Sequence, residues 1–134
     1  MLSEDIKDNI RAAYNAIVES KSLTPRWGQR QMIAEIANTL SRIPPAGEGD
    51  SGLPAVCVIE AGTGTGKTIA YAVAAIPMAQ ALGKRLVVAT ATIALQEQFV
   101  NKDLPDIRQS SGMNFSFALA KGRRRYVCLS KLDR

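Results

Sequence analysis

The run from Ala61 to Thr68, which reads AGTGTGKT, constrains the fold of this chain more than any other feature. A short apolar run from Val56 to Ile59 leads into it, and a long helix-forming run from Ile69 to Leu82 follows it. A glycine-rich turn between a strand and a helix is typical of a phosphate-binding loop, because its backbone N–H groups point inward and the positive end of the helix faces the phosphate. The sequence therefore predicts a strand–loop–helix unit that binds a nucleotide.

Every position of this loop is a candidate contact with the nucleotide, namely Ala61, Gly62, Thr63, Gly64, Thr65, Gly66, Lys67 and Thr68. Lys67 is expected to reach the β- and γ-phosphates and the Thr68 hydroxyl to take one Mg²⁺ position, so both are candidate catalytic residues. ATP and Mg²⁺ are the expected cofactors. The strict pattern opens with glycine, whereas Ala61 stands there in this chain. The alternative is a glycine- and threonine-rich turn with an unrelated lysine.

The composition bounds the class of protein. A chain of 134 residues suffices for one domain of ordinary size, and 46% hydrophobic with 22% charged residues is typical of a globular protein. No apolar run approaches the roughly 20 residues that a membrane-spanning helix needs. The acidic residues Glu4 and Asp5 stand where a signal peptide would be basic. We therefore expect a monomeric, cytoplasmic protein with no membrane partner.

Hydrophobic spacing predicts two helices before the loop, and alternating strands and helices around and after it. The expected helices run from a cap at Ser3 to about Ser20, from about Gly28 to Arg42, from the loop to about Leu82, and from a cap at Thr92 to about Val100. The expected strands are residues 55–60, 85–90 and 115–120. Pro77 is expected to bend or restart its helix and Gly83 to end it, while Leu104 and Pro105 are expected to close the last helix.

This order of elements, ααβαβαβ, predicts an α/β fold with a parallel sheet covered by helices on both faces. The segment 85–90 is almost continuously apolar, as a strand buried on both faces would be. Cys57, within the first expected strand, is expected to be a small buried hydrophobe. Residues 44–54 are rich in proline and glycine and predict a flexible surface loop inside the domain.

Gln29 is the candidate contact with the nucleotide base. It lies in the segment 26–31, upstream of the loop. A glutamine amide offers one acceptor and two donors, which matches the edge of adenine and can distinguish it from guanine. The alternative is a surface glutamine at the start of a helix, which is commonplace.

Thr90 and Thr92 are candidates for contact with nucleic acid. They follow an expected strand at the point where hydroxyls and backbone N–H groups can hold a phosphodiester of a single strand. The alternative is that Thr92 only caps the following helix, a role that uses the same backbone donors.

The basic segment 121–128 is a second candidate nucleic-acid contact, in a chain of net charge +5. Arg123, Arg124 and Arg125 can pair phosphates, and Tyr126 can stack a base. The alternative is a solvated surface loop. Cys128, considered alone, is an ordinary thiol, because one cysteine cannot hold a cluster.

Together, the segments 26–31, 60–68, 87–98 and 121–128 resemble the N-terminal part of the DinG-type helicases, which are iron–sulfur DNA helicases of superfamily two related to the XPD group. The resemblance covers essentially the whole chain in order and spacing. It implies a partial RecA-like P-loop motor domain that moves 5′ to 3′ on single-stranded DNA, unwinds forked or looped duplexes and serves DNA repair. It also implies that Gln29 senses adenine and that Cys128 is the first ligand of a [4Fe–4S] cluster, which needs four thiolates.

The resemblance divides the chain into a helical lead-in (1–43), a flexible loop (44–54), a P-loop βαβαβ unit (55–120) and the start of an iron–sulfur region (121–134). Three cluster cysteines, an acidic Asp-Glu box and the second motor domain of the family are not found in it. The arginine finger of that second domain contributes on the order of 10³–10⁵ in rate. We therefore expect the N-terminal part of a longer helicase, which alone binds nucleotide without efficient hydrolysis.

Two other classes of protein remain open. One is a natural non-catalytic module that binds nucleotide or nucleic acid and derives from such a helicase. The other is an unrelated P-loop ATPase or kinase, which would leave the patterns in 87–98 and 121–128 as coincidence.

Overall fold

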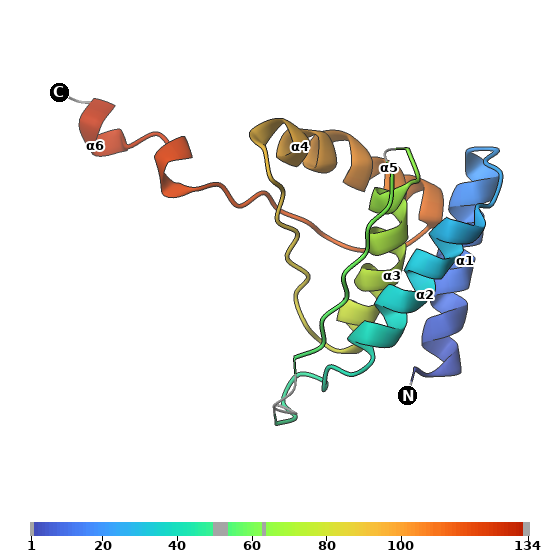
Figure 1. Ribbon diagram of the computed structural model, residues 1–134. Helices are drawn as coiled ribbons and strands as arrows, with labels where there is room; N and C mark the ends of the chain where they lie inside the picture. The colour runs from blue at the N-terminus through green and yellow to red at the C-terminus, as the bar shows by residue number, and fades with distance from the viewer. Residues whose placement is uncertain (1, 50–53, 63, 133–134) are drawn as a thin grey trace.

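The computed structural model describes residues 2–49, 54–62 and 64–132 of the chain. The regular elements of these residues are α1 (Glu4–Ser20), α2 (Trp27–Leu40), α3 (Lys67–Ala81), α4 (Ile93–Gln98), the π-helical turn η1 (Phe99–Asp103), α5 (Leu104–Ser111), the 3-10 turn η2 (Arg123–Arg125) and α6 (Leu129–Leu132). In Figure 1, α1, α2 and α3 lie side by side, and the chain after α5 crosses the molecule and leaves it as an arm that ends in α6. Among the helices of the described residues, none is both long and apolar enough to span a membrane.

Local signals set the ends of the helices as predicted. The Ser3 hydroxyl accepts a hydrogen bond from the Ile6 N–H at 3.4 Å and caps α1. The Thr92 hydroxyl accepts one from the Leu95 N–H at 3.2 Å and caps α4. Gly83 adopts a left-handed φ of 63° just after α3, which lets the chain turn back there and end the helix.

The core lies where α3 packs between the other long helices. Helix α3 is apolar all round, as a central helix should be, and its residues from Ala72 to Met78 are all buried. Helices α1 and α2 each turn one apolar face toward it, and α5 packs against α1. The buried side chains that these three helices contribute are Ile10, Ala13, Tyr14, Ile17, Met32, Ile33, Ala37 and Ile107.

The prediction of a parallel sheet is wrong for the described residues, because they contain no strand (Figure 1). Residues 55–60, 85–90 and 115–120 are non-helical segments without regular structure, and no backbone hydrogen bond joins one to another. A strand is stable only beside a neighbour that pairs its N–H and C=O groups. Without one, Val58 is 90% exposed, Val87 is 85% exposed, and Cys57 is exposed rather than buried.

The third of these segments still follows a strand-like pattern. Residues 113–120 alternate between half-buried and exposed side chains, which gives the segment one inward face. On that face the Phe115 and Phe117 rings lie 6.1 Å apart, and the Arg108 guanidinium of α5 lies 5.4 Å from the Phe117 ring. The Gln80 side chain donates a hydrogen bond to the Asn114 carbonyl at 2.7 Å. Side-chain packing on the helices therefore holds this segment in place of a sheet.

One expectation about proline is wrong, and a second, that Pro77 bends or restarts its helix, is ruled out only for the restart. The helix after Thr92 does not close at Leu104 and Pro105, because it continues through η1 into α5 and ends at Gly112, whose φ is 70°. Proline is tolerated in the first turn of α5, where its missing N–H has no helical partner. Helix α3 does not restart at Pro77, because that residue is buried inside one continuous helix whose packing offsets the lost hydrogen bond.

Two expectations fall partly outside the described residues. Residues 50–53 of the predicted loop 44–54, and Thr63 of the predicted phosphate-binding loop, are not among them. The start of loop 44–54 is fixed to the end of α3, since the Ala46 N–H donates to the Leu82 carbonyl at 2.8 Å.

Candidate nucleotide site

The glycine-rich loop turns sharply into the first residue of α3. Gly64 and Gly66 have left-handed φ angles of 77° and 78°, which residues with a side chain rarely adopt. Gly66 is the N-cap of α3, so the first free N–H groups of that helix face the loop. The Thr65 hydroxyl donates to the Gly62 carbonyl at 2.8 Å and narrows the turn. Gly64 and Gly66 thus stand where the backbone favours glycine, whereas Gly62 has neither a left-handed φ nor a close neighbour.

The Lys67 side chain folds back over its own loop. Its ammonium donates to the carbonyl oxygens of Ala61 at 2.6 Å and Gly62 at 2.9 Å. Lys67 is exposed, so these bonds compete with water and exchange readily. The loop therefore holds one positive charge against its backbone, at the end of α3 that favours an anion.

Thr68 follows in the first turn of α3 and is half-buried. Its hydroxyl interacts with the phenol of Tyr71, one turn further along the helix. Burial raises the pKa of Tyr71; hydrogen bonding to Thr68 opposes this shift, and the Asp103 carboxylate adds to it. Tyr71 stays protonated at neutral pH. It also packs on Phe99 with ring centroids 5.8 Å apart.

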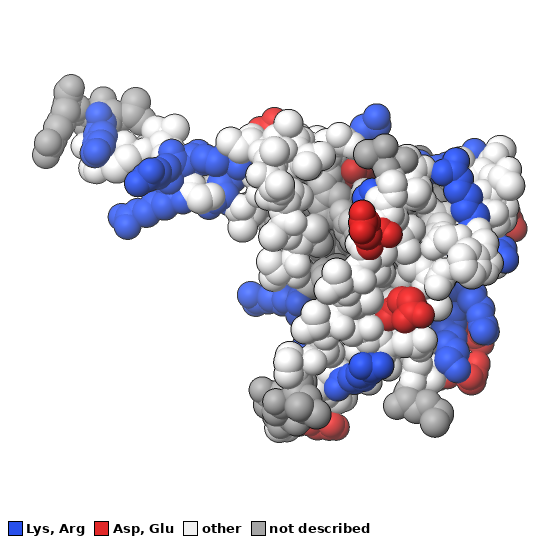
Figure 2. Space-filling view, viewed as in Figure 1, with Lys and Arg blue, Asp and Glu red and all other residues white. Residues whose placement is uncertain are grey.

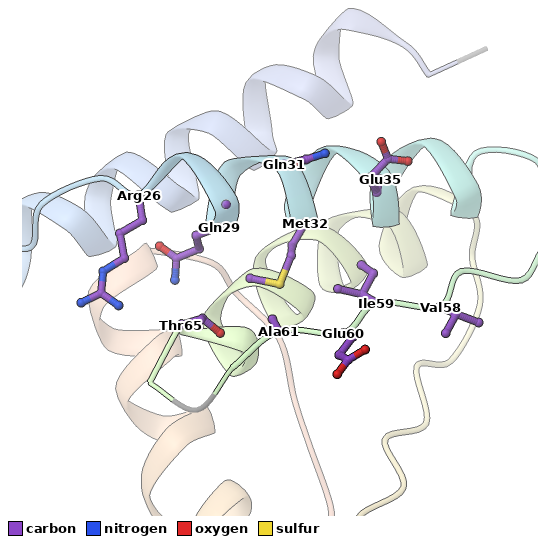
Figure 3. A pocket seen from close by; sticks show the side chains of 11 residues that line it. Arg26, Gln29, Gln31, Met32, Glu35, Val58, Ile59, Glu60, Ala61 and Thr65 are labelled. Carbon is purple, nitrogen blue, oxygen red and sulfur yellow. The ribbon is translucent and has the colours of Figure 1, made fainter.

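Two side chains of α2 hold the loop from outside. The Arg26 guanidinium donates to the Gly64 carbonyl at 2.7 Å, and the Gln29 amide nitrogen donates to the Gly66 carbonyl at 3.1 Å. Between α2 and residues 58–61 lies an open cavity of about 520 Å³, lined also by Met32 and Glu35 (Figure 3). Figure 3 shows Arg26 and Gln29 pointing from α2 toward the loop at one end of this cavity.

The structure places Gln29 beside the loop, and its surroundings differ from those of the surface glutamine that was the alternative; its contact with adenine stays a prediction. Gln29 is 8% exposed, and its amide oxygen accepts a hydrogen bond from the Tyr14 hydroxyl at 2.9 Å. Sequence analysis missed the roles of Arg26 and Tyr14. Arg26 opens the segment that contains Gln29, and this was the only available signal. Tyr14 fits the apolar spacing of α1 and gave none.

Thr90 and Thr92 lie away from the loop, before α4. The Thr90 hydroxyl donates to the Thr92 carbonyl at 3.2 Å, and the Thr92 hydroxyl is used as the helix cap. Arg125 reaches the same helix, since its guanidinium donates to the Gln96 side-chain oxygen and lies 3.7 Å from the Glu97 carboxylate. The structure thus joins the two candidate nucleic-acid segments at α4, through Gln96, which sequence analysis had not singled out.

The basic segment forms the start of the C-terminal arm. Arg123 and Arg124 are exposed, whereas Arg125 is half-buried against α4. Tyr126 is 56% exposed, and its hydroxyl accepts a hydrogen bond from the Lys121 N–H at 3.1 Å. Figure 2 shows Lys and Arg side chains gathered on this arm, which extends from the body of the molecule. An exposed aromatic ring can stack on a base and exposed guanidiniums can pair with phosphates, so this arm has the groups that bind single-stranded nucleic acid.

Cys128 lies on the same arm, and its sulfur is 3.1 Å from the Ser130 hydroxyl. That hydrogen bond is the main cause that lowers the pKa of the thiol; desolvation opposes it, and hydrogen bonds to the Lys131 and Ser130 backbone add to the lowering. The described residues do not fit a [4Fe–4S] cluster, because no three of their His, Cys, Asp or Glu side chains form a group that could hold a metal. A role for Cys128 in a cluster of a longer protein stays a prediction.

Known proteins are similar to this chain over most of its length. Residues 26–131 match the DEAD/DEAH box helicase family. The chain is 45% identical over 134 residues to the ATP-dependent DNA helicase DinG of Photobacterium profundum, covering 99% of this chain and 18% of that protein. It is 43% identical over 128 residues to the ATP-dependent DNA helicases DinG of Escherichia coli K12 and Salmonella typhimurium, covering 95% of this chain and 16% of each. The chain thus spans less than a fifth of the length of these relatives.

These matches confirm the resemblance to DinG-type helicases that the sequence motifs indicated. The family match contains the loop, the helix that holds it and the basic segment. Because it extends over most of the chain, this protein belongs to the DEAD/DEAH box helicase family.

Proposed function

We propose that this chain is the N-terminal, nucleotide-binding part of an ATP-dependent DNA helicase that moves 5′ to 3′ on single-stranded DNA. The observation that carries the proposal is the Lys67 ammonium held against a loop with two left-handed glycines. The relatives are ATP-dependent DNA helicases, which supports ATP as the nucleotide and DNA as the polymer. Forked or looped duplexes, DNA repair and a cytoplasmic location belong to the same proposal.

In the proposed site, Lys67 exchanges its bonds to the Ala61 and Gly62 carbonyls for the β- and γ-phosphates of ATP. The loop backbone from Ala61 to Gly66 and the start of α3 hold the remaining phosphate oxygens. The Thr68 hydroxyl takes one Mg²⁺ position. This residue set fits the metal, because hydroxyl and phosphate oxygens are the hard ligands that Mg²⁺ prefers. The metal would neutralise charge on the phosphates.

The base would occupy the cavity between α2 and residues 58–61. Its volume of about 520 Å³ lies in the range of small-molecule sites, which is roughly 300–1,000 Å³. Gln29 lies at the end nearest the loop, so a base in the cavity and phosphates on the loop belong to one molecule (Figure 3).

We further propose that the 134-residue chain binds ATP without efficient hydrolysis. Among the described residues, no group of three acidic, histidine or cysteine side chains is placed to complete a metal site. Thr68 would therefore be the main protein ligand of Mg²⁺, with little to orient the attacking water. Single-stranded DNA would contact the surface formed by α4 and the basic arm.

A titration with fluorescent Mg-ATP tests the nucleotide site. Lys67→Ala should lower the affinity at least tenfold, the scale of a lost charge-assisted contact of about 1.5–3 kcal/mol. Lys102→Ala removes an equal charge from an exposed site on η1 and should bind like the parent. Equal affinity in the parent and Lys67→Ala, with unchanged circular dichroism, would reject the loop as a phosphate site.

An ATPase assay with single-stranded DNA then separates two classes of protein. Hydrolysis by the full-length protein, but not by the 134-residue chain, would support the helicase. Absence of hydrolysis in the full-length protein would instead favour a non-catalytic nucleotide-binding module.

A further inference from the structure

Three residues that are far apart in sequence form one buried chain of hydrogen bonds. The Tyr14 hydroxyl of α1 donates to the Gln29 side-chain oxygen at 2.9 Å. The Gln29 amide nitrogen donates to the Gly66 carbonyl at 3.1 Å. Tyr14 is 5% exposed and Gln29 8% exposed, so water competes poorly for these bonds. Helix α1 is thereby linked to the last glycine of the loop.

The chain of bonds permits only one orientation of the Gln29 amide. The Gly66 carbonyl carries no hydrogen, so the amide nitrogen, not the oxygen, must face it. The amide oxygen must then face Tyr14, whose hydroxyl is the donor that a buried oxygen requires. A flipped amide would set two oxygens against each other at Gly66.

Gly66 is fitted closely to this arrangement. A Cβ atom at Gly66 would lie 2.1 Å from the Gln29 amide nitrogen. The Gly66 carbonyl also accepts the Ala70 N–H at 3.0 Å, so it is fixed by the first turn of α3 as well. The acceptor that defines the Gln29 orientation is therefore itself immobile.

We propose that Tyr14 is a positioning residue that determines base specificity through Gln29; this rests on the proposed nucleotide site. With its oxygen bound to Tyr14 and one N–H bound to Gly66, Gln29 keeps one N–H and one oxygen lone pair for a ligand. A fixed pair of one donor and one acceptor matches the adenine edge, whose amino group donates and whose ring nitrogen accepts. At the corresponding positions guanine presents a carbonyl and a ring N–H, which a fixed amide meets with the wrong groups.

The test measures affinities of the 134-residue chain for Mg-ATP and Mg-GTP in the parent, in Tyr14→Phe and in Thr39→Val. Tyr14→Phe removes one oxygen and keeps the ring in the core, so the Gln29 oxygen loses its donor and only the bond to the Gly66 carbonyl still holds the amide, which can then tilt out of its binding position. The ratio of the GTP to the ATP dissociation constant should fall about tenfold, with the loss mainly in ATP affinity. Thr39→Val removes another buried hydroxyl, one that donates to the Glu35 carbonyl on α2, and should keep the ratio.

A purely structural role of Tyr14 would weaken both nucleotides in the same proportion, and this result would overturn the proposal. An unchanged ratio in Tyr14→Phe, or a parent that does not distinguish the two nucleotides, would also overturn it. A parent that binds neither nucleotide would instead reject the proposed nucleotide site. Tyr14→Phe in a Gln29→Ala background should change the ratio no further, because the residue through which it acts is gone.

A second measurement does not depend on nucleotide affinity. In the parent, the Gln29 side-chain amide proton that is bonded to the Gly66 carbonyl should exchange slowly with water, because this bond is partly buried. Tyr14→Phe should shift the NMR signal of this proton and speed its exchange, while the backbone signals of α3 stay in place. Unchanged Gln29 signals would overturn the proposal even if the variant folds less stably.

Discussion

The Arg26 guanidinium donates a hydrogen bond to the Gly64 carbonyl at 2.7 Å, across 38 residues of sequence. Arg26 is the N-cap residue of α2, and Gln29 stands one turn further along the same helix and holds Gly66. Two side chains at the start of α2 thus donate hydrogen bonds to two carbonyls of the loop. The shape of the glycine loop is set by α2 as well as by its own sequence.

Removal of the Arg26 contact should weaken nucleotide binding. Arg26→Ala frees the Gly64 carbonyl, and the cost of re-ordering the loop should lower Mg-ATP affinity about three- to tenfold, the scale of one net hydrogen bond. Arg30→Ala is the matched control, since it removes the same charge from an exposed site on the same helix. Isothermal titration of both variants separates the hydrogen bond from general electrostatic attraction. Equal losses in the two variants would mean that only the charge matters.

The two left-handed glycines should differ in their tolerance of alanine. Gly64→Ala meets no atom within 4 Å and should cost about 1–2 kcal/mol of unfolding free energy from backbone strain alone. Gly66→Ala adds a collision with the Gln29 amide. Urea unfolding should therefore show a loss of unfolding free energy that exceeds the loss in Gly64→Ala by about 1–3 kcal/mol, because a buried polar group is displaced. Gln29→Ala should recover part of the Gly66→Ala loss and none of the Gly64→Ala loss. Strict additivity of both pairs would contradict this account.

The arm arginines should divide into two kinds. Arg123 and Arg124 are exposed, so Arg123→Ala with Arg124→Ala should weaken single-stranded DNA binding and flatten its log–log salt slope by about 1.4, or about 0.7 for each phosphate contact. Fluorescence anisotropy at several salt concentrations measures the slope. The control is Arg85→Ala with Lys84→Ala, which removes two exposed charges elsewhere. An unchanged salt slope in the arm variant would mean that Arg123 and Arg124 do not contact DNA phosphates and form a solvated surface.

Arg125 should act on the arm itself. Its guanidinium bonds to Gln96 and lies beside Glu97, so Arg125→Ala should release the arm from α4. Hydrogen exchange of residues 121–127 should then speed up, while that of α3 stays the same. Gln96→Ala removes the other side of the contact together with the hydrogen bond from the Gln96 amide to the Ala120 carbonyl at 3.2 Å, so exchange should speed up at least as much. Parent-like exchange in Gln96→Ala would show that Arg125 is held by something else.

The lowered pKa of Cys128 gives a prediction of reactivity. The Ser130 hydroxyl is the main cause of the shift, so the thiolate should be present at a lower pH than in an ordinary exposed cysteine. In a Cys57→Ser background, the rate of alkylation should rise with pH around a midpoint below that of free cysteine. Ser130→Ala should move this midpoint upward. If the midpoint pH is the same in Ser130→Ala as in the parent, the two side chains do not interact in solution.

The features that sequence predicts well are those set by neighbouring residues. Ser3, Thr92 and Gly83 act within one turn of their own position, so each cap could be predicted from its local pattern. Gly64 and Gly66 are of the same kind, because their left-handed φ angles favour glycine whatever surrounds them. The apolar spacing of α1 and α2 also predicts their buried faces correctly.

The features that sequence predicts poorly depend on distant partners. Val58 and Val87 lie in segments whose residue types are typical of strands. A sheet also needs a neighbouring strand, which the residue types of one segment cannot supply, and both side chains are exposed. The role of Tyr14 depends on Gln29 and Gly66, which only the packing of α1, α2 and α3 brings together. In α1 alone, Tyr14 is one more apolar position. The contacts that position the loop could therefore be identified only from the structure.

The exposed valines give a direct test of the correction to the fold. Val58→Lys and Val87→Lys change residues that are 90% and 85% exposed, so each should alter the unfolding free energy by no more than about 0.5 kcal/mol. Both should also raise solubility, because they break exposed apolar surface. Val73→Lys is the opposite control, since Val73 is 0% exposed in the middle of α3 and an unpaired buried charge there should prevent folding. Urea unfolding followed by circular dichroism measures all three. A loss above about 2 kcal/mol for either exposed valine would show that its segment is packed against a partner in solution, because only a buried position carries a penalty of that size.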